Sequence, residues 1–355
     1  MKIIKIFTIL GLIMNLFACE KKPVYSVKKY SEFESNFIYA KKTNNLLEIN
    51  KEEIVINNND NKSDEDVIDK PDKNGITHSK DETIEVSYIV TDNGKTFTGL
   101  DSLSPVKYIV KDPYNVENLS TQSYSFSFGA ASNGQAHHIT IDNQKRFDSY
   151  GSNALAWDNK TNEKILYLTF DCGYEYENLT SLMLDTLKEK GVSAAFFCTQ
   201  SYLKSSPQVV TRMIMEGHIV GNHSVTHPSN CATLTKEELA KELLGVHNYL
   251  RVNFGYQSKY FRFPTGAYSE SAIDLVNSVG YRSIFWSIAH ADWDPNDQPG
   301  IDVSFNTVTS RLHPGAVILL HTTSPDNEKI LGDFIDYARN EGYVFKTLDE
   351  YNYFK

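Results

Sequence analysis

The stretch that decides the fold is ILYLTFDCGYE, residues 165–175. Its first six residues are apolar, aromatic or β-branched, which is typical of a strand buried on both faces. Asp171 follows directly, so the strand ends in a charge. Parallel strands of an α/β sheet end at one common face, where reactive groups collect. The stretch therefore predicts a central parallel strand with Asp171 at its tip.

Short apolar runs that alternate with amphipathic segments continue to the end of the chain. Short apolar runs recur: ILYLTF, AAFFCT, HIVGNH, KYFRF, RSIFWS, AVILLH and YVFK. Amphipathic segments lie between them, over residues 178–190, 207–216, 236–253, 270–279, 305–312 and 328–340. Pro207 suits a first helical turn, and Gly191, Gly217, Gly280 and Gly342 suit helix ends. Seven strands with intervening helices predict a parallel, barrel-like α/β sheet.

The first nineteen residues have the layout of a secretory signal. Lys2 and Lys5 precede an apolar run that ends at Ala18 and Cys19. A cysteine after a small residue resembles a bacterial lipobox, which implies cleavage before Cys19 and a lipid anchor on its sulfur. A plain signal and an uncleaved anchor are the alternatives. In each case we expect an extracytoplasmic protein; our prediction is a lipoprotein-type signal peptide over residues 1–18 and attachment to the membrane through Cys19.

Residues 19–120 differ from the rest of the chain. Residues 41–82 are rich in Asn, Asp, Lys and Ser and have few aromatic residues, which predicts a spacer. IEVSYIV and SPVKYIV then flank a polar turn, which predicts a small accessory β element of two strands. The pattern of apolar and polar residues changes near residue 120, so we place a catalytic domain over residues 121–355.

Composition and charge limit the function. A hydrophobic content of 41% over 355 residues is enough for a sizeable core. The formal charge of -10 argues against a nucleic-acid partner, because phosphate binding needs a clustered positive field. Beyond Cys19 the chain has three cysteines, Cys172, Cys198 and Cys231, which cannot all pair in disulfides. We expect Cys198 to be a small core residue.

Polar side chains stand at the ends of the predicted strands: Asp171, His223, Arg262, Asp292 and His321. His223 and His227 in HSVTH are four residues apart, so a helical turn there would let both imidazoles share a divalent ion. Two unrelated surface histidines are the alternative. Four further histidines are interpreted as structural or surface residues: His137, His138, His218 and His290.

The remaining strand-end residues form two possible pairs. A guanidinium from Arg262 beside Asp171 would keep that carboxylate ionised; otherwise Asp171 caps a helix and Arg262 caps a carbonyl or pairs at the surface. A carboxylate from Asp292 would fix the tautomer of His321 and make it a proton donor, the alternative being a structural histidine. Trp293 offers an apolar wall for a sugar or an acetyl methyl group, or packs in the core.

In this order TFDCG, HSVTH, RFPTG, DW and LLH resemble the five motifs of the polysaccharide deacetylases, carbohydrate esterase family 4. TFDCGYE, EGHIVGNHSVTHP, FWSIAHADWDPNDQPG and HPGAVILLHTTSPDNEKIL are similar to one branch, the delta-lactam-biosynthetic de-N-acetylases of spore-forming bacteria. The similarity extends upstream through SFGAASNGQ and AWDN, and so covers about residues 125–355. The resemblance implies a distorted, often seven-stranded (β/α) barrel.

The resemblance also implies roles at matching positions. Asp171 would be the general base, Arg262 its ionic partner, and His223 and His227 the ligands of a divalent metal ion, with zinc expected. Cys172 stands where most of the family has a metal-ligating aspartate. A thiolate ligand, a two-histidine site completed by water, and a cysteine that only packs all remain open.

Three further residues complete the implied site. His321 would protonate the leaving amine, and Asp292 would orient it. The backbone N–H of Thr265 would join the metal in stabilising the oxyanion. With Trp293 beside the substrate, this set has one group for each requirement of amide hydrolysis: an activated water, charge stabilisation and a proton for the amine.

The resemblance implies a metal-dependent peptidoglycan deacetylase that hydrolyses the linear amide of N-acetylmuramic acid during spore cortex synthesis. It would act on glycan strands after an N-acetylmuramoyl amidase has removed the stem peptide, so that muramic delta-lactam can form. An N-acetylglucosamine or chitin-like polymer deacetylase is the alternative among enzymes. A non-catalytic glycan-binding module is the alternative of another class, because Cys172 replaces a ligand.

Overall fold

The computed structural model describes residues 70–71, 75–88, 106–151 and 154–354. The predicted signal peptide, Cys19 and most of the predicted spacer lie outside these residues. Within the described part, no helix combines the length and the apolar character needed to cross a bilayer.

An eight-stranded parallel sheet forms the centre of the fold, in the order β13-β7-β8-β9-β10-β12-β6, with β14 paired to the start of β7. The strands are β6 (Ala154–Leu155), β7 (Ile165–Cys172), β8 (Ala195–Cys198), β9 (Ile219–Asn222), β10 (Tyr260–Phe261), β12 (Arg282–Ile284), β13 (Ala316–His321) and β14 (Val344–Phe345). Trp157, just after β6, bridges to Ala316 of β13, so the two edges of the sheet curl toward each other. The predicted fold class, a distorted α/β barrel, is confirmed.

Each of the seven predicted strands is present, and β6 is an eighth that the sequence did not predict. Two residues are too few to show a hydrophobic period, so β6 has no local signal. β7 is buried at all eight positions, as the opening stretch predicts. Its Leu166 and Phe170 pack in the same core cluster as Leu184 of α3 (Leu179–Lys190) and Phe334 of α9 (Pro325–Asn340), while Tyr167 belongs to another cluster that includes Phe197.

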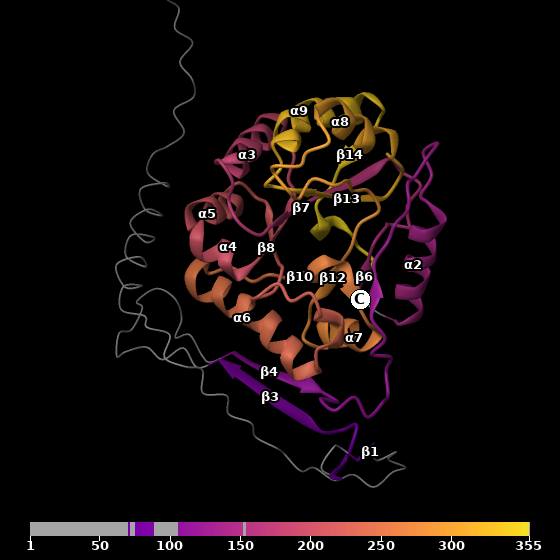
Figure 1. Cartoon of the computed structure of the whole chain (residues 1–355), viewed down its shortest axis with the longest axis vertical. Helices are drawn as coiled ribbons and strands as arrows, with labels where there is room; N and C mark the ends of the chain where they lie inside the picture. The colour runs from indigo at the N-terminus through magenta and orange to yellow at the C-terminus, as the bar shows by residue number, and fades with distance from the viewer. Residues whose placement is uncertain (1–69, 72–74, 89–105, 152–153, 355) are drawn as a thin grey trace, which may run out of the picture. The chain divides into compact units, whose positions relative to one another are not determined.

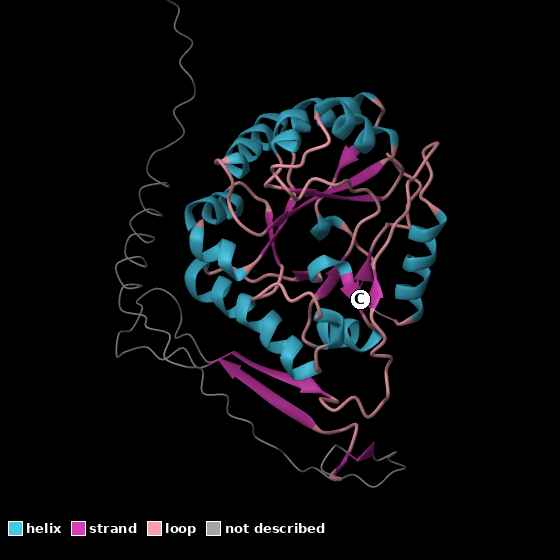
Figure 2. Ribbon diagram, viewed as in Figure 1, coloured by secondary structure: helices cyan, strands magenta, loops and turns pink. Residues whose placement is uncertain are grey.

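Helices surround the sheet, as Figures 1 and 2 show. Besides α3 and α9 they are α2 (His138–Ser149), α4 (Gln200–Ser205), α5 (Pro207–Met215), α6 (Lys236–Phe254), α7 (Glu270–Ser278) and α8 (Ile301–Ser310), and short 3-10 turns are η1 (Cys231–Thr233), η2 (Pro264–Gly266) and η3 (Leu348–Glu350). The six predicted helices are confirmed within a few residues at each end. α2 and α4 were not predicted: α2 is largely polar and α4 has only six residues.

Local capping explains why the helices begin and end where they do. α6 begins with a capping box, in which the Thr235 hydroxyl accepts from the backbone of Glu238 and the Glu238 carboxylate accepts from the backbone of Thr235. α5 has Pro207 in its first turn. α3 ends at Gly191, whose φ of 61° is a left-handed conformation that costs glycine little.

The N-terminal part of the described chain contains two antiparallel pairs. β3 (Thr83–Tyr88) pairs with β4 (Val106–Lys111), which confirms the predicted two-stranded element. β1 (Lys70–Pro71) pairs with β2 (Thr77–His78), so the C-terminal end of the predicted spacer contains a short antiparallel pair. The remaining antiparallel pair joins β5 (Tyr124–Ser125) to β11 (Ala267–Tyr268).

Candidate active site

The predicted strand-end residues meet at the carboxyl ends of the sheet strands. Asp171 and His321 are direct partners on the neighbouring parallel strands β7 and β13. His223 follows β9, and Arg262 follows β10, which pairs with β9. Residues from distant parts of the chain therefore converge because parallel strands end on one side of the sheet.

A buried ion pair lies at the centre of this region. Nη1 of Arg262 donates to Oδ1 of Asp171 over 2.7 Å, and the Arg262 side chain is completely buried. Burial alone would raise the pKa of Asp171, but the charges of Arg262, His223 and His321 outweigh it and hold the pKa below its ordinary value. Asp171 is therefore ionised and oriented, as predicted, rather than free to cap a helix.

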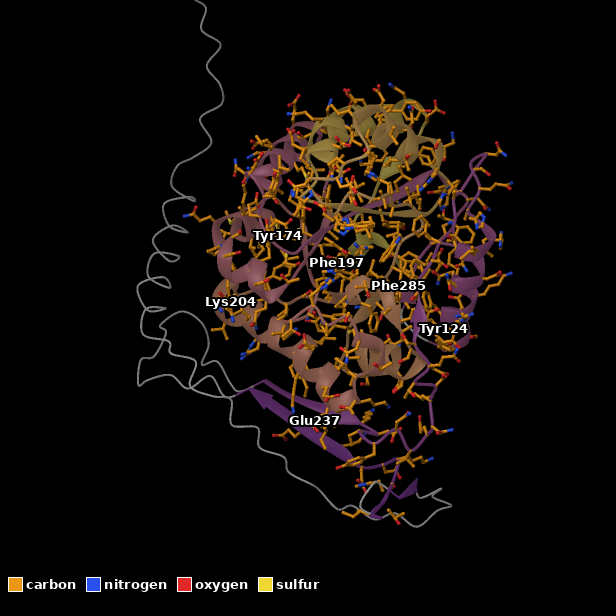
Figure 3. The ribbon with its side chains drawn as sticks, viewed as in Figure 1. Tyr124, Tyr174, Phe197, Lys204, Glu237 and Phe285 are labelled. Carbon is orange, nitrogen blue, oxygen red and sulfur yellow. The ribbon has the colours of Figure 1, made fainter. Side chains whose placement is uncertain are left out.

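The rest of the Arg262 guanidinium is also engaged. Nε donates to the carbonyl of Ile284 over 3.0 Å, and Nη2 donates to Oγ1 of Thr169 over 2.8 Å. The ring of Phe197, labelled in the interior of the molecule in Figure 3, lies 4.1 Å from the guanidinium carbon. These contacts fix the plane of the guanidinium, which a buried arginine needs to offset its desolvation. The sequence did not identify Thr169.

His223 presents one nitrogen to the centre of the site. Its Nδ1 is 2.9 Å from the carbonyl oxygen of Arg262, and its Nε2 is 3.4 Å from Oδ2 of Asp171. A carbonyl only accepts, so Nδ1 carries the hydrogen and Nε2 keeps a lone pair in the neutral ring. Burial, partly offset by Asp171, lowers the pKa of His223 to about 4. A neutral imidazole whose second nitrogen donates to a carbonyl is the usual form of a histidine metal ligand.

His227 lies beside His223, with ring centroids 4.8 Å apart and planes at 75°. The helical turn that would have brought the two imidazoles together is wrong: residues 223–228 form a loop, in which Ser224 and His227 have φ values of 70° and 55°. In the part of the chain that the structure describes, no group of three or more His, Cys, Asp or Glu side chains is arranged to hold a metal ion. The donors available here for a divalent ion are therefore the two adjacent imidazoles.

Cys172 packs among apolar side chains. Its side chain is fully buried in the apolar cluster that contains Phe170, Leu184 and Cys198, whereas Asp171 contacts Arg262 and His223. Successive side chains of a strand point to opposite faces, so Cys172 faces the helices when Asp171 faces the site. Burial and Cys198 raise the pKa of its thiol well above the ordinary value. Of the three alternatives left open for Cys172, its burial in this cluster favours the cysteine that only packs over the thiolate ligand.

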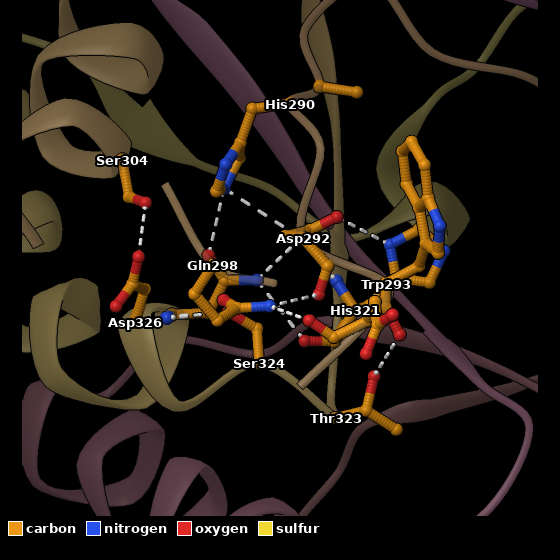
Figure 4. A network of polar contacts seen from close by, with 12 residues as sticks. His290, Asp292, Trp293, Gln298, Ser304, His321, Thr323, Ser324 and Asp326 are labelled. Atoms are coloured by element: carbon orange, nitrogen blue, oxygen red, sulfur yellow. Dashed lines mark hydrogen bonds and ion pairs between the residues drawn. The ribbon is translucent and has the colours of Figure 1, made fainter. Parts of the chain in front are cut away.

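His321 and Asp292 form the second polar pair. Nδ1 of His321 donates to Oδ1 of Asp292 over 2.7 Å, and the backbone N–H of His321 donates to Oδ2 over 2.8 Å (Figure 4). Burial alone would lower the pKa of His321, but Asp292 and Asp171 outweigh it and raise the pKa above its ordinary value. The two aspartates therefore favour the protonated form of the ring, and the contact of Nδ1 with Asp292 fixes the ring's orientation.

Two residues that the sequence did not single out support Asp292. Nδ2 of Asn327 donates to Oδ2 of Asp292 over 2.6 Å, and Nε2 of His290 lies 2.9 Å from Oδ1 of Asn327. Figure 4 shows His290 and His321 approaching Asp292 from different chain segments. His290, interpreted from the sequence as structural or surface, thus belongs to this network. Both residues lie in stretches that carry the family resemblance, His290 in FWSIAHADWDPNDQPG and Asn327 in HPGAVILLHTTSPDNEKIL, but neither belongs to one of the five short motifs.

Trp293 and Thr265 lie in loops beside these groups. Trp293 is 62% exposed, so the core-packing alternative is wrong, and its ring stands edge-on to that of His321 at 6.4 Å. Thr265 is exposed in η2 with a φ of 57°, a conformation uncommon for a residue other than glycine. An oxyanion role for its N–H stays a prediction.

The geometry provides a carboxylate paired with arginine, an imidazole paired with a carboxylate, and two neighbouring histidines at one end of the sheet. A carboxylate can accept a proton from water, and an imidazolium can donate one to a leaving group. Two imidazoles are suitable ligands for a divalent ion. The arrangement can therefore support hydrolysis of an amide or ester.

Known proteins are similar to this chain in sequence and in fold. The family model for polysaccharide deacetylase matches residues 158–284. The chain is 41% identical over 191 residues to the peptidoglycan-N-acetylmuramic acid deacetylase PdaA of Bacillus subtilis, covering 54% of this chain and 72% of PdaA. It is 44% identical over 189 residues to an uncharacterised 30.6 kDa protein of Geobacillus stearothermophilus, covering 53% of this chain and 71% of that protein. The solved structure of Bacillus subtilis PdaA, a family 4 carbohydrate esterase, aligns with a TM-score of 0.61 at 36% identity. This alignment covers 65% of this chain and 97% of the PdaA chain. This chain belongs to the polysaccharide deacetylases, carbohydrate esterase family 4.

Proposed function

We propose that this protein is a metal-dependent peptidoglycan deacetylase that removes the acetyl group from N-acetylmuramic acid residues. The observation that carries the proposal is that Asp171, whose pKa is lowered, and His321, whose pKa is raised, are partners on adjacent strands, next to two histidines. A base and an acid whose ionisation states differ in this way are what amide hydrolysis requires. Within our proposal the catalytic domain spans residues 121–355.

Each residue has a task in this reaction. Asp171, held by Arg262, accepts a proton from the attacking water. His321, held by Asp292, gives a proton to the amine as the C–N bond breaks, so that the sugar leaves as a neutral amine. The backbone N–H of Thr265 donates to the oxygen that becomes negative. Trp293 lies against the sugar or the acetyl methyl group.

His223 and His227 would hold a divalent ion, which we propose to be zinc. Bound there, the ion would act as a Lewis acid toward the acetyl carbonyl and would lower the pKa of water. Nε2 of His223 lies 3.4 Å from Oδ2 of Asp171, and this proximity of the proposed ligand to the proposed base supports the assignment.

The choice of substrate rests on relatives. PdaA, whose name specifies N-acetylmuramic acid, is 41% identical to this chain. We propose that the product forms muramic delta-lactam in spore cortex, after an amidase has removed the stem peptide. We propose further that the protein acts outside the cytoplasm, anchored by a lipid on Cys19.

Acetate release tests the proposal. Purified protein with zinc should release acetate from peptide-free muramic acid in glycan strands, and the product should then lose water as the lactam closes. Asp171→Asn should reduce the rate at least about 100-fold, because a general base contributes roughly 100- to 10,000-fold. Intact acetyl groups after incubation with the unmodified protein would refute the proposal.

Product mass spectrometry separates the alternatives. Acetate loss from N-acetylglucosamine residues instead of muramic acid would identify the other deacetylase. Glycan binding without acetate release, unchanged in Asp171→Asn, would identify a non-catalytic binding module. The buried Asp171–Arg262 pair, which lies at the reaction centre that catalysis requires, favours the enzyme.

A further inference from the structure

We propose that Glu242 is a positioning residue, whose carboxylate fixes the loop between His223 and His227 in the conformation that binds a metal ion. Glu242 lies on α6, outside every motif that defines the predicted site. The inference rests on the proposed function, because it assumes that the two histidines bind the metal.

The Glu242 carboxylate accepts three hydrogen bonds from the middle of the loop. Oε2 accepts from the backbone N–H of Val225 over 3.0 Å and from that of Thr226 over 2.8 Å. Oε1 accepts from the Thr226 hydroxyl over 2.8 Å. Hydrogen bonds to an ionised acceptor are stronger than those between neutral groups. One side chain therefore holds both residues at the centre of the histidine loop.

The loop needs such support because of its backbone. Ser224 and His227, on either side of Val225 and Thr226, have φ values of 70° and 55°. Left-handed conformations of residues other than glycine persist only where the surroundings impose them. His227 itself is exposed, so packing does little to hold it. Without Glu242 we expect the loop to relax and the distance between the two imidazoles to vary.

A second contact comes from the same turn of α6. Asn222 is fully buried, donates from Nδ2 to the carbonyl of Leu243 over 2.8 Å, and accepts at Oδ1 from the N–H of Ser224 over 3.0 Å. α6 is itself fixed by its capping box and by Gly255 at its end. A rigid helix thus supports the histidine loop, which is how precise sites are commonly built.

The test compares three variants of the full chain. Glu242→Ala removes both acceptor oxygens, and with them all three hydrogen bonds, at a helix position that tolerates alanine. Glu242→Gln keeps three contacts: its amide oxygen can accept from the two N–H groups, while the bond to Thr226 reverses and the NH2 donates to the hydroxyl oxygen. Glu237→Ala is the matched control, because Glu237 lies on the same helix (Figure 3) and pairs with Lys241.

Two measurements are made on each variant. The first is amide hydrogen exchange of residues 223–227 in metal-free protein. The second is the zinc dissociation constant, measured by competition with a chromogenic chelator. For Glu242→Ala we expect at least about tenfold faster exchange and about 10- to 100-fold weaker zinc binding, the usual loss when a residue supporting a ligand is removed. Glu242→Gln and Glu237→Ala should remain within about threefold of the unmodified protein.

The outcomes separate this inference from the proposed function. Unchanged exchange in Glu242→Ala, or faster exchange with unchanged zinc binding, would overturn the positioning role alone. Absence of zinc binding in the unmodified protein would overturn the proposed metal site and this inference together. Weakened zinc binding in Glu242→Ala, with rescue by Glu242→Gln, would support it.

Discussion

At the level of single residues, the site depends on what each aspartate contacts. Asp171 lies against the guanidinium of Arg262, a cation that does not titrate, and so remains a proton acceptor. Asp292 lies against His321, a group that does titrate, and its charge raises the pKa of the imidazole. The proposed base and the proposed acid thus differ because the partners of the two carboxylates differ.

This difference predicts the pH dependence of the reaction. His321 must be protonated to act as an acid, so kcat/KM should fall as the pH rises through its raised pKa. Asp292→Asn removes the charge that raises this pKa, and the alkaline limb should move to lower pH by about one unit or more. The pH profile of acetate release measures the shift, with the exposed Asp294→Asn as a control that should leave the limb in place.

The stability of the fold should also decrease as the pH rises through the pKa of His321. Because the folded-state pKa of His321 lies above its unfolded value of about 6.5, the pair stabilises the fold fully below that value. The contribution is lost as the pH rises through the folded-state pKa.

In the pH profile of acetate release, an alkaline limb that stays in place in Asp292→Asn would show that His321 is not the acid.

At the level of elements, the alternation of β7 assigns neighbouring residues to different tasks. Phe170 and Cys172 pack toward the helices, and Asp171 between them contacts Arg262. The family motif places Cys172 at a ligand position, but the strand directs its side chain into an apolar cluster. The replaced aspartate therefore has no counterpart in this site.

Cys172→Ala tests this directly. Zinc affinity and acetate release should stay within about threefold of the unmodified protein, because the thiol does not reach the site. The free energy of unfolding should fall by about 1–2 kcal/mol, since a small side chain is lost from a packed core. Urea unfolding and zinc titration measure the two effects. Cys198→Ala, in the same cluster, is the control and should show the same small effects on zinc affinity, acetate release and unfolding. Loss of zinc binding in Cys172→Ala but not in Cys198→Ala would show that the Cys172 thiolate is a metal ligand.

At the level of the whole molecule, Lys236 links the N-terminal part of the described chain to the barrel. Its ammonium lies 3.6 Å from Oδ2 of Asp112, just after β4, and 3.0 Å from Oδ2 of Asp274 on α7. Both Lys236 and Asp112 are almost fully buried, with side chains 3% and 7% exposed. The accessory strands are thus attached through a buried charge pair rather than by a chain connection alone.

Lys236→Ala should loosen this attachment. It leaves Asp112 buried without its cation, which should lower the free energy of unfolding by about 3 kcal/mol. Urea unfolding measures the loss, and limited proteolysis should cleave near residues 112–120 sooner than in the unmodified protein. Lys241→Ala, which removes an ion pair that is 36% exposed on each side, is the control and should cost less than about 0.5 kcal/mol. Equal losses in the two variants would contradict the attachment.

The sequence by itself determined the fold class, seven of the eight strands and the residues at their tips. Apolar runs, caps and glycine stops are local signals, and the common direction of parallel strands brings Asp171, His223, Arg262 and His321 together without further information. Only the tertiary structure decided the direction of Cys172, the loop of His227, and the contacts of Asn327 and Glu242. The reason is that these depend on contacts between distant segments: Asn327 lies 35 residues from Asp292 and Glu242 lies 16 from Thr226, and no local pattern encodes such pairs.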